Sequence, residues 1–115
     1  MFLLLTLMGC GSYTMSSFYV KNTSNKPVNF NASVLKYSQM GPFLLNVPFT
    51  VKAKDSVLAR KVALRNDVTP EKWFEKFDIF PVDSLEFNDP KNALNWIKSI
   101  GQDGKPMYTF NIVKQ

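Results

Sequence analysis

Apolar and polar residues alternate along two stretches of the chain. In Val28–Val34 and in Phe43–Val51 every second residue is apolar. Successive side chains of a β-strand point to opposite faces of the sheet, so this spacing predicts two strands that each bury one face. Because Pro48 has no backbone N–H to donate, we expect the second strand at a sheet edge or at a bulge.

Shorter apolar runs between turn-forming residues predict further strands. The turn signals are Thr23–Pro27, Gly41–Pro42, Lys54–Asp55 and Gly101–Pro106. The remaining strands are expected at Phe18–Asn22, Val57–Leu64 and Met107–Val113, with one bent strand across Ile79–Phe87.

A threonine followed by a proline predicts a first short helix. Thr69 can cap its N-terminus, and Pro70 suits the first helical position. Trp73 and Phe77 then share one face, while charged residues cover the opposite face. We expect this face to pack on the sheet and to bury Trp73.

Asp89 and Pro90 predict a second short helix in the same way. Leu94 and Ile97 form its apolar stripe, and Trp96 lies at the margin, where we expect partial exposure. Aromatic side chains often anchor interfaces, so Trp73 and Trp96 are the candidate partner-binding residues.

Many short strands with regularly spaced turns indicate a mainly β fold. We expect a small antiparallel β-sandwich, Ig-like or transthyretin-like, with one or two short helical connections. A small α+β sheet is the alternative. The 115 residues show no break in composition, so residues 18–115 are expected to form a single domain.

The N-terminal residues have the features of a leader. The apolar run Phe2–Leu7 is far shorter than the roughly 20 residues that a membrane-spanning helix needs. It continues into Leu7-Met8-Gly9-Cys10, which resembles the lipobox of bacterial lipoproteins, although Met8 stands where a small residue is usual. The resemblance implies a signal peptide over residues 1–9 and fatty acyl chains such as palmitate on Cys10.

The segment after Cys10 is polar and contains no acid up to Ser17. Residues 10–17 are therefore expected to be a lipidated tether. By resemblance to lipoprotein sorting rules, the missing acid implies the outer membrane, with the domain facing the periplasm. The alternative is that Phe2–Leu7 forms a buried first strand and that Cys10 is an ordinary small apolar residue.

Charge is distributed unevenly along the chain. Residues 1–66 hold eight Lys or Arg and one acid, whereas residues 67–115 hold six and eight. A basic half can attract anionic lipid or nucleic acid. Only two arginines are present, and specific phosphate or base recognition favours the arginine fork. We expect no nucleic-acid partner and interpret the cations, Arg60 among them, as solvated strand and turn residues.

The chain contains no histidine and a single cysteine. This composition excludes Ser–His and Cys–His nucleophiles, most zinc sites and a disulfide within the chain. A serine–lysine pair stays open as an alternative. Asp83, Glu86 and Asp89 offer oxygen ligands, but their spacing does not match a calcium loop. We expect no catalytic residue, no metal and no cofactor.

Four short segments follow one another along the chain: Val20–Thr23, Lys54–Val57, Thr69–Phe74 and Asn88–Lys98. This succession is similar to that of small bacterial lipoproteins of the Bacteroidota to which no activity is assigned. The resemblance covers most of the chain after Cys10 and implies a location and a fold. We expect a membrane-anchored, non-enzymatic binding or structural module of the cell envelope with an envelope protein as partner. The alternative is a lipoprotein that binds a small ligand, a glycan or a peptide, in a transport or secretion system.

Overall fold

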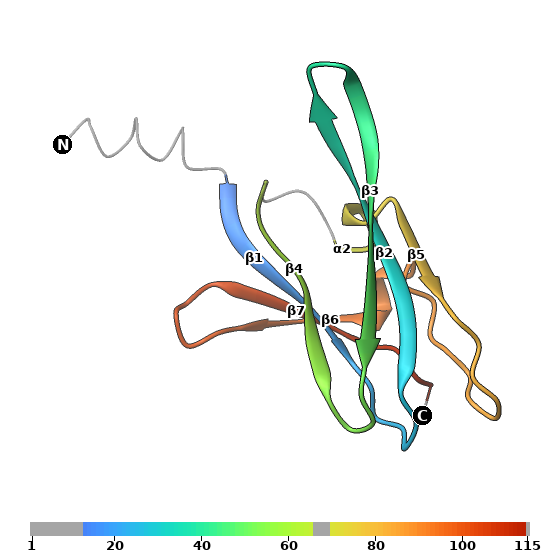
Figure 1. Ribbon diagram of the computed structural model, residues 1–115. Helices are drawn as coiled ribbons and strands as arrows, with labels where there is room; N and C mark the ends of the chain where they lie inside the picture. Colours follow the sequence, from blue (N-terminus) through green and yellow to red (C-terminus); the bar gives the residue numbers. More distant parts are fainter. Residues whose placement is uncertain (1–12, 66–69, 115) are drawn as a thin grey trace.

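The computed structural model describes residues 13–65 and 70–114. Its strands are β1 (Tyr13–Lys21), β2 (Val28–Ser38), β3 (Gly41–Val51), β4 (Ser56–Arg65), β5 (Lys76–Ile79), β6 (Trp96–Ile100) and β7 (Pro106–Asn111). They form one sheet of order β4-β1-β7-β6 and another of order β3-β2-β5, which pack against each other (Figure 1). The predicted small β-sandwich is confirmed.

Strand β1 lies in the middle of the first sheet, which is mixed rather than purely antiparallel. It runs antiparallel to β4 over its whole length and parallel to β7 over Ser17–Lys21. The second sheet is dominated by one long hairpin, in which β2 and β3 pair from Val28 with Val51 to Ser38 with Gly41. Strand β5 pairs only with Phe30–Ser33, so β2 has no second neighbour beyond Ser33 among the described strands.

The core lies between the inner faces of the two sheets and is rich in aromatic rings. Neighbouring rings in this cluster have centroids between 4.9 and 6.3 Å apart. Its members are Phe18, Phe30, Phe74, Phe77, Trp96 and Phe110. Aliphatic side chains such as Val20, Val28 and Val51 complete the core and have no exposed surface. Burial of these apolar residues supplies the main driving force for joining the sheets.

A buried asparagine joins the loops at the end of the core opposite the hairpin turn. The Asn22 amide nitrogen donates to the carbonyls of Lys26 at 2.7 Å and of Val51 and Lys52 at 3.2 Å each. Its oxygen accepts from the backbone and the hydroxyl of Ser24. Every polar atom of this fully buried side chain has a partner, so Asn22 fixes the β1–β2 and β3–β4 connections together.

Strand β1 begins at Tyr13, five residues before the start at Phe18 that the sequence suggested. Ser16 is buried, and Ser17 pairs with Lys61 and with Met107. Residues 13–17, expected to be part of a tether, therefore belong to the sheet. They lack an apolar alternation because Ser16 occupies an inward position.

The first predicted helix exists only as a single turn, α2 (Pro70–Trp73). Phe77 does not share a helical face with Trp73 but lies on β5, where it pairs with Ala32. Immediately before this strand, the Glu75 N–H donates to the Ser33 carbonyl at 2.7 Å. Hydrogen bonds to the free edge of β2 thus replace those that a longer helix would make.

The prediction of a second helix is wrong. Asn92 caps a short 3₁₀ turn, η1 (Ala93–Asn95), and the chain then enters β6 at Trp96. Trp96 is only 6% exposed, whereas Leu94 is 88% exposed and Ile97 is also exposed, the reverse of the expected pattern. Pairing with β7 gives β6 the backbone partners that a helix would have supplied internally.

The bent strand expected across residues 79–87 is also shorter than predicted. Strand β5 ends at Ile79, and Phe87 makes an isolated bridge with Val113.

Across the described ranges, no helix has the length and the apolar character needed to cross a membrane.

Candidate functional site

A groove of about 660 Å³ opens at the end of the sandwich from which the β2–β3 hairpin projects. We call it the mouth groove. Strand β2, strand β4 and the segment around α2 form its walls. Its lining residues are Val34, Leu35, Lys36, Tyr37, Arg60, Val62, Lys72, Trp73 and Glu75.

A β-bulge turns Arg60 toward the inside of the sandwich. Phe18 pairs with Arg60, but the next residue of β1, Tyr19, pairs with Leu58, so Ala59 is an extra residue in β4. In a regular strand, Arg60 and Val57 would point to opposite faces. The bulge shifts the alternation by one residue and places Arg60 on the inner face, beside the groove.

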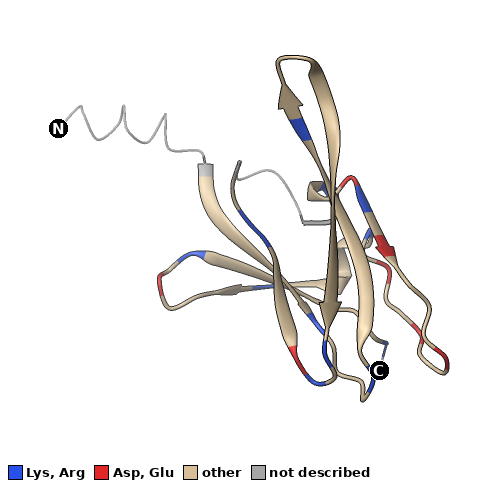
Figure 2. Ribbon diagram, viewed as in Figure 1, with Lys and Arg blue, Asp and Glu red and all other residues tan. Residues whose placement is uncertain are grey.

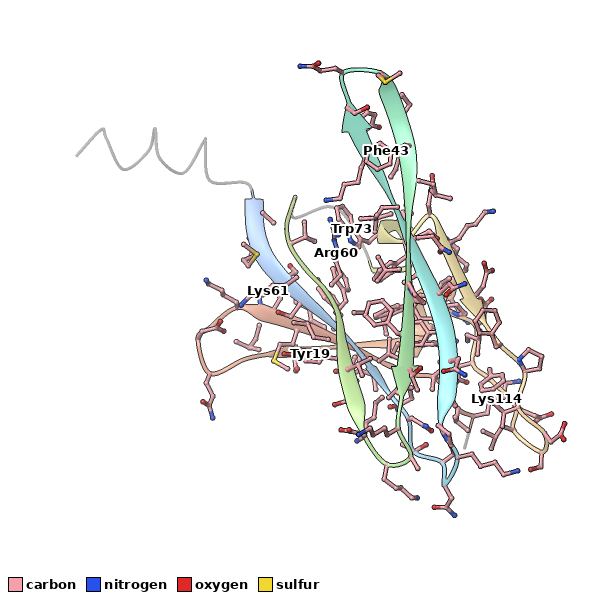
Figure 3. The ribbon with its side chains drawn as sticks, viewed as in Figure 1. Tyr19, Phe43, Arg60, Lys61, Trp73 and Lys114 are labelled. Atoms are coloured by element: carbon pink, nitrogen blue, oxygen red, sulfur yellow. The ribbon has the colours of Figure 1, made fainter. Side chains whose placement is uncertain are left out.

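Trp73, at the end of α2, forms the opposite wall of the groove. Its ring lies under the Arg60 guanidinium, with 5.7 Å between the guanidinium carbon and the ring centroid. Figure 3 shows the two side chains next to each other between β4 and the hairpin, with Phe43 farther out along the hairpin. The contact is a cation–π pair near the upper limit of distance for such pairs, about 6 Å. Trp73 is half-buried and also packs against the edge of the core.

Two nitrogen donors in this pair have no acceptor. The Arg60 Nε and the Trp73 Nε1 are both inaccessible to solvent and make no hydrogen bond within the described structure. Leaving a buried donor unpaired costs about 1–3 kcal/mol. By contrast, the Trp96 Nε1, deep in the core, donates to the Pro90 carbonyl at 2.8 Å. The two buried donors at the groove therefore lack acceptors, whereas the Trp96 Nε1 in the core has one.

The described residues that line the groove carry a net positive charge. Lys36, Arg60 and Lys72 are present among them with one carboxylate, Glu75. Val34 and Val62 contribute apolar surface. This combination suits a group that carries an acceptor or a negative charge next to an apolar portion.

The structure separates the residues that the sequence singled out. Trp73 lines the groove, whereas Trp96 is buried among Phe18, Phe77 and Phe110 and is only 6% exposed. Cys10 lies outside the described residues.

Arg60 was missed because it was interpreted as a solvated strand residue. A signal for its true position exists in the sequence. Val57 and Val62 are five residues apart, so a regular strand cannot bury both on one face. A bulge between them resolves this conflict and brings Arg60 inward.

A second, smaller hollow of about 340 Å³ lies on the outer face of the first sheet. Tyr19 and Lys61 line it from β1 and β4, and the loop between β6 and β7 forms its rim (Figure 3).

The described part of the chain contains no group of three or more acids or cysteines that could hold a metal ion.

A serine–lysine hydrogen bond occurs elsewhere, between Lys26 Nζ and Ser84 Oγ at 3.1 Å. Both side chains are exposed. The contact therefore lacks the enclosed surroundings in which a lysine can activate a serine.

No family model matches this chain, and comparisons with curated proteins and with solved structures give no match either.

Proposed function

We propose that this chain is a lipid-anchored, non-enzymatic binding module of the cell envelope, and that the mouth groove captures its partner. The lipobox-like segment ending at Cys10 supports the anchor, and the absence of an acid directly after it supports an outer-membrane location facing the periplasm. The geometry of the groove supports the binding role.

One observation carries the binding role: the two unpaired donors of Arg60 and Trp73. Both are inaccessible to water in the free protein, so an oxygen acceptor of a bound group could reach them only after the Arg60 and Trp73 side chains move apart. It would then supply hydrogen bonds to two donors that have none in the free protein. Such a site discriminates strongly between partners that carry the acceptor and partners that lack it.

The lining suggests an acidic or carbonyl-rich segment of an envelope protein. Three cations and one carboxylate are found among the described lining residues, so negative charge on the partner is favoured. The flat indole of Trp73 and the apolar surface of Val34 and Val62 would hold an adjoining apolar side chain.

The groove volume favours a second candidate, a small ligand such as a glycan or peptide in a transport or secretion system. About 660 Å³ falls within the range of roughly 300–1,000 Å³ typical of ligand pockets. In this case the acceptor would come from a free carboxylate or from sugar oxygens.

Capture from detergent-solubilised envelopes tests the proposal. The unchanged protein and the control Leu94→Ala, which alters an exposed apolar residue away from the groove, should retain the same partner. The variants Arg60→Met and Trp73→Ala should lose it while they still melt cooperatively. Equal capture by all four proteins would contradict the groove as the binding site. Native mass spectrometry separates the candidates, because a small ligand would appear as added mass on the chain.

A further inference from the structure

The distal part of the β2–β3 hairpin extends beyond the core. Val34 is the last buried residue of β2. Residues 35–45, which we call the hairpin tip, extend past the other sheet, so that sheet does not cover their side chains. Six large apolar side chains are exposed there, among them Tyr37 at 76% and Met40 at 99%. The others are Leu35, Phe43, Leu44 and Leu45. Exposed apolar groups of this density mark a contact surface.

The exposed groups lie on both faces of the hairpin. Val34 pairs with Leu45 and Lys36 with Phe43, which places Phe43 and Leu45 on the face that continues the core. Leu35 pairs with Leu44 on the opposite face. A protein partner or a second copy docked on one face would leave the other face exposed to water. Burial of all the exposed apolar side chains requires surroundings that contact both faces of the hairpin tip and its turn.

We propose that the hairpin tip inserts into the surface of a lipid bilayer. The hairpin carries no acid: Lys36 is the only charged residue between Val28 and Val51, and the hairpin is otherwise tan in Figure 2. A carboxylate at this position would be repelled by anionic head groups, whereas a lysine is attracted to them. Tyr37 adds an amphipathic ring of the kind that favours the bilayer interface.

The backbone limits the depth of insertion. Beyond Ser33, β2 has β3 as its only neighbour among the described strands, so the outer edges of the two-stranded tip have free N–H and C=O groups. Such groups are too costly to place in the hydrocarbon centre. The tip therefore seats in the head-group and upper acyl region, about 5–10 Å deep.

The proposed lipid anchor would hold this same end of the molecule at the membrane, and to that extent the inference rests on the proposed function. The mouth groove brings Val34–Tyr37 of β2 against Arg60 and Val62 of β4, and Tyr13 pairs with Arg65 farther along in that direction. In Figure 1 the start of β1 and the hairpin tip lie at the same end. Cys10 is three residues before Tyr13, a span of at most about 11 Å.

Quenching by brominated lipids tests the insertion. The full chain, purified from membranes, is reconstituted into vesicles of phosphatidylcholine and phosphatidylglycerol that carry bromine in the upper acyl chain. Met40→Trp places a reporter at the turn, and Leu94→Trp places a matched reporter away from it, at a position that is also highly exposed. Trp73 and Trp96 give the same background in both. Quenching should be about twofold or more stronger for Met40→Trp, with a blue-shifted emission.

Adding Phe43→Asp and Leu44→Asp to Met40→Trp should reduce quenching to the level of the Leu94→Trp control, because one carboxylate then lies on each face of the tip. Equal quenching of the two reporters would overturn the inference. A blue shift without lipid that grows with protein concentration would also overturn it, since the tip would then contact a second copy. The mass of the Cys10 fragment from the same sample reports the anchor separately, so either idea can fail alone.

Discussion

Phe18 on β1 pairs with Arg60 on β4, and the bulge at Ala59 beside this pair places a guanidinium at the inner margin of the sandwich. Phe18 belongs to the core, where its ring stacks on Tyr108 and meets Trp96 edge-on. Arg60 lies just beyond the core, against Trp73. The same pair of strands therefore supplies both the packed interior and the polar wall of the mouth groove.

Arg60→Met should leave the free energy of unfolding within about 1 kcal/mol of the original value or raise it. The change removes a buried unpaired donor and keeps a chain of similar length, at the loss of a cation–π contact that contributes about 0.5–2 kcal/mol. Urea denaturation measures the difference. A loss of several kcal/mol would mean that Arg60 is mainly a structural residue.

The two tryptophans should differ in the opposite sense to that expected from sequence. Trp96→Ala should lower the free energy of unfolding by about 3–5 kcal/mol, because the ring is buried in the aromatic cluster. Trp73→Ala should cost clearly less, since its ring is half-exposed at the groove. Thermal melts of the two variants compare them directly, and a larger loss for Trp73→Ala would refute the assignment.

Asn22→Asp should destabilise the fold by about 3–5 kcal/mol near neutral pH. A carboxylate cannot donate to the carbonyls of Lys26, Val51 and Lys52, and their dipoles raise its pKa in the folded state. The folded protein then binds more protons than the unfolded chain, so stability falls as pH rises above about 3.9. Melts across this range test the sign, with Asn25→Asp in the exposed part of the same loop as control.

A chain that begins at Phe18 should be less stable than one that begins at Tyr13. It lacks the part of β1 that pairs with Lys61–Arg65, so half of β4 loses its only neighbour in the sheet. Hydrogen exchange at Lys61, Val62 and Ala63 should become much faster in the shorter chain. Unchanged protection there would show that residues 13–17 contribute nothing to the fold.

Alternation of apolar residues predicted the long strands well because these strands each cover one face of the core. Val28–Val34 and Phe43–Val51 lie within β2 and β3, with no helical alternative of the same period. Strands β5 and β6 lie in segments that were predicted as helices because Thr69–Pro70 and Asp89–Pro90 are typical helix starts. The spacing of Trp73 and Phe77 also fits a helical period. Long-range pairing with β2 decided the outcome at Phe77.

The turn before β7 contained the information that would have identified β6. The Gly101 and Lys105 backbones are hydrogen-bonded across it, and Gly104 takes a positive φ of 79°. Turns of this kind are common in β-hairpins, so the strand after the turn favours a second strand before it. The groove was harder to predict, because it depends on one inserted residue in β4 and on contacts between Arg60 and Trp73.

Mass spectrometry of the protein extracted from its native membranes tests the proposed lipid-anchored envelope module, because it gives the mass of the N-terminal fragment. We expect a fragment that starts at Cys10 and carries the added mass of a diacylglycerol and of any further acyl chain on its amino group. In the Cys10→Ser variant this added mass should be absent, and the protein should either leave the membrane or keep its leader unprocessed. A fragment that starts at Met1 with an unmodified Cys10 would refute the lipid anchor.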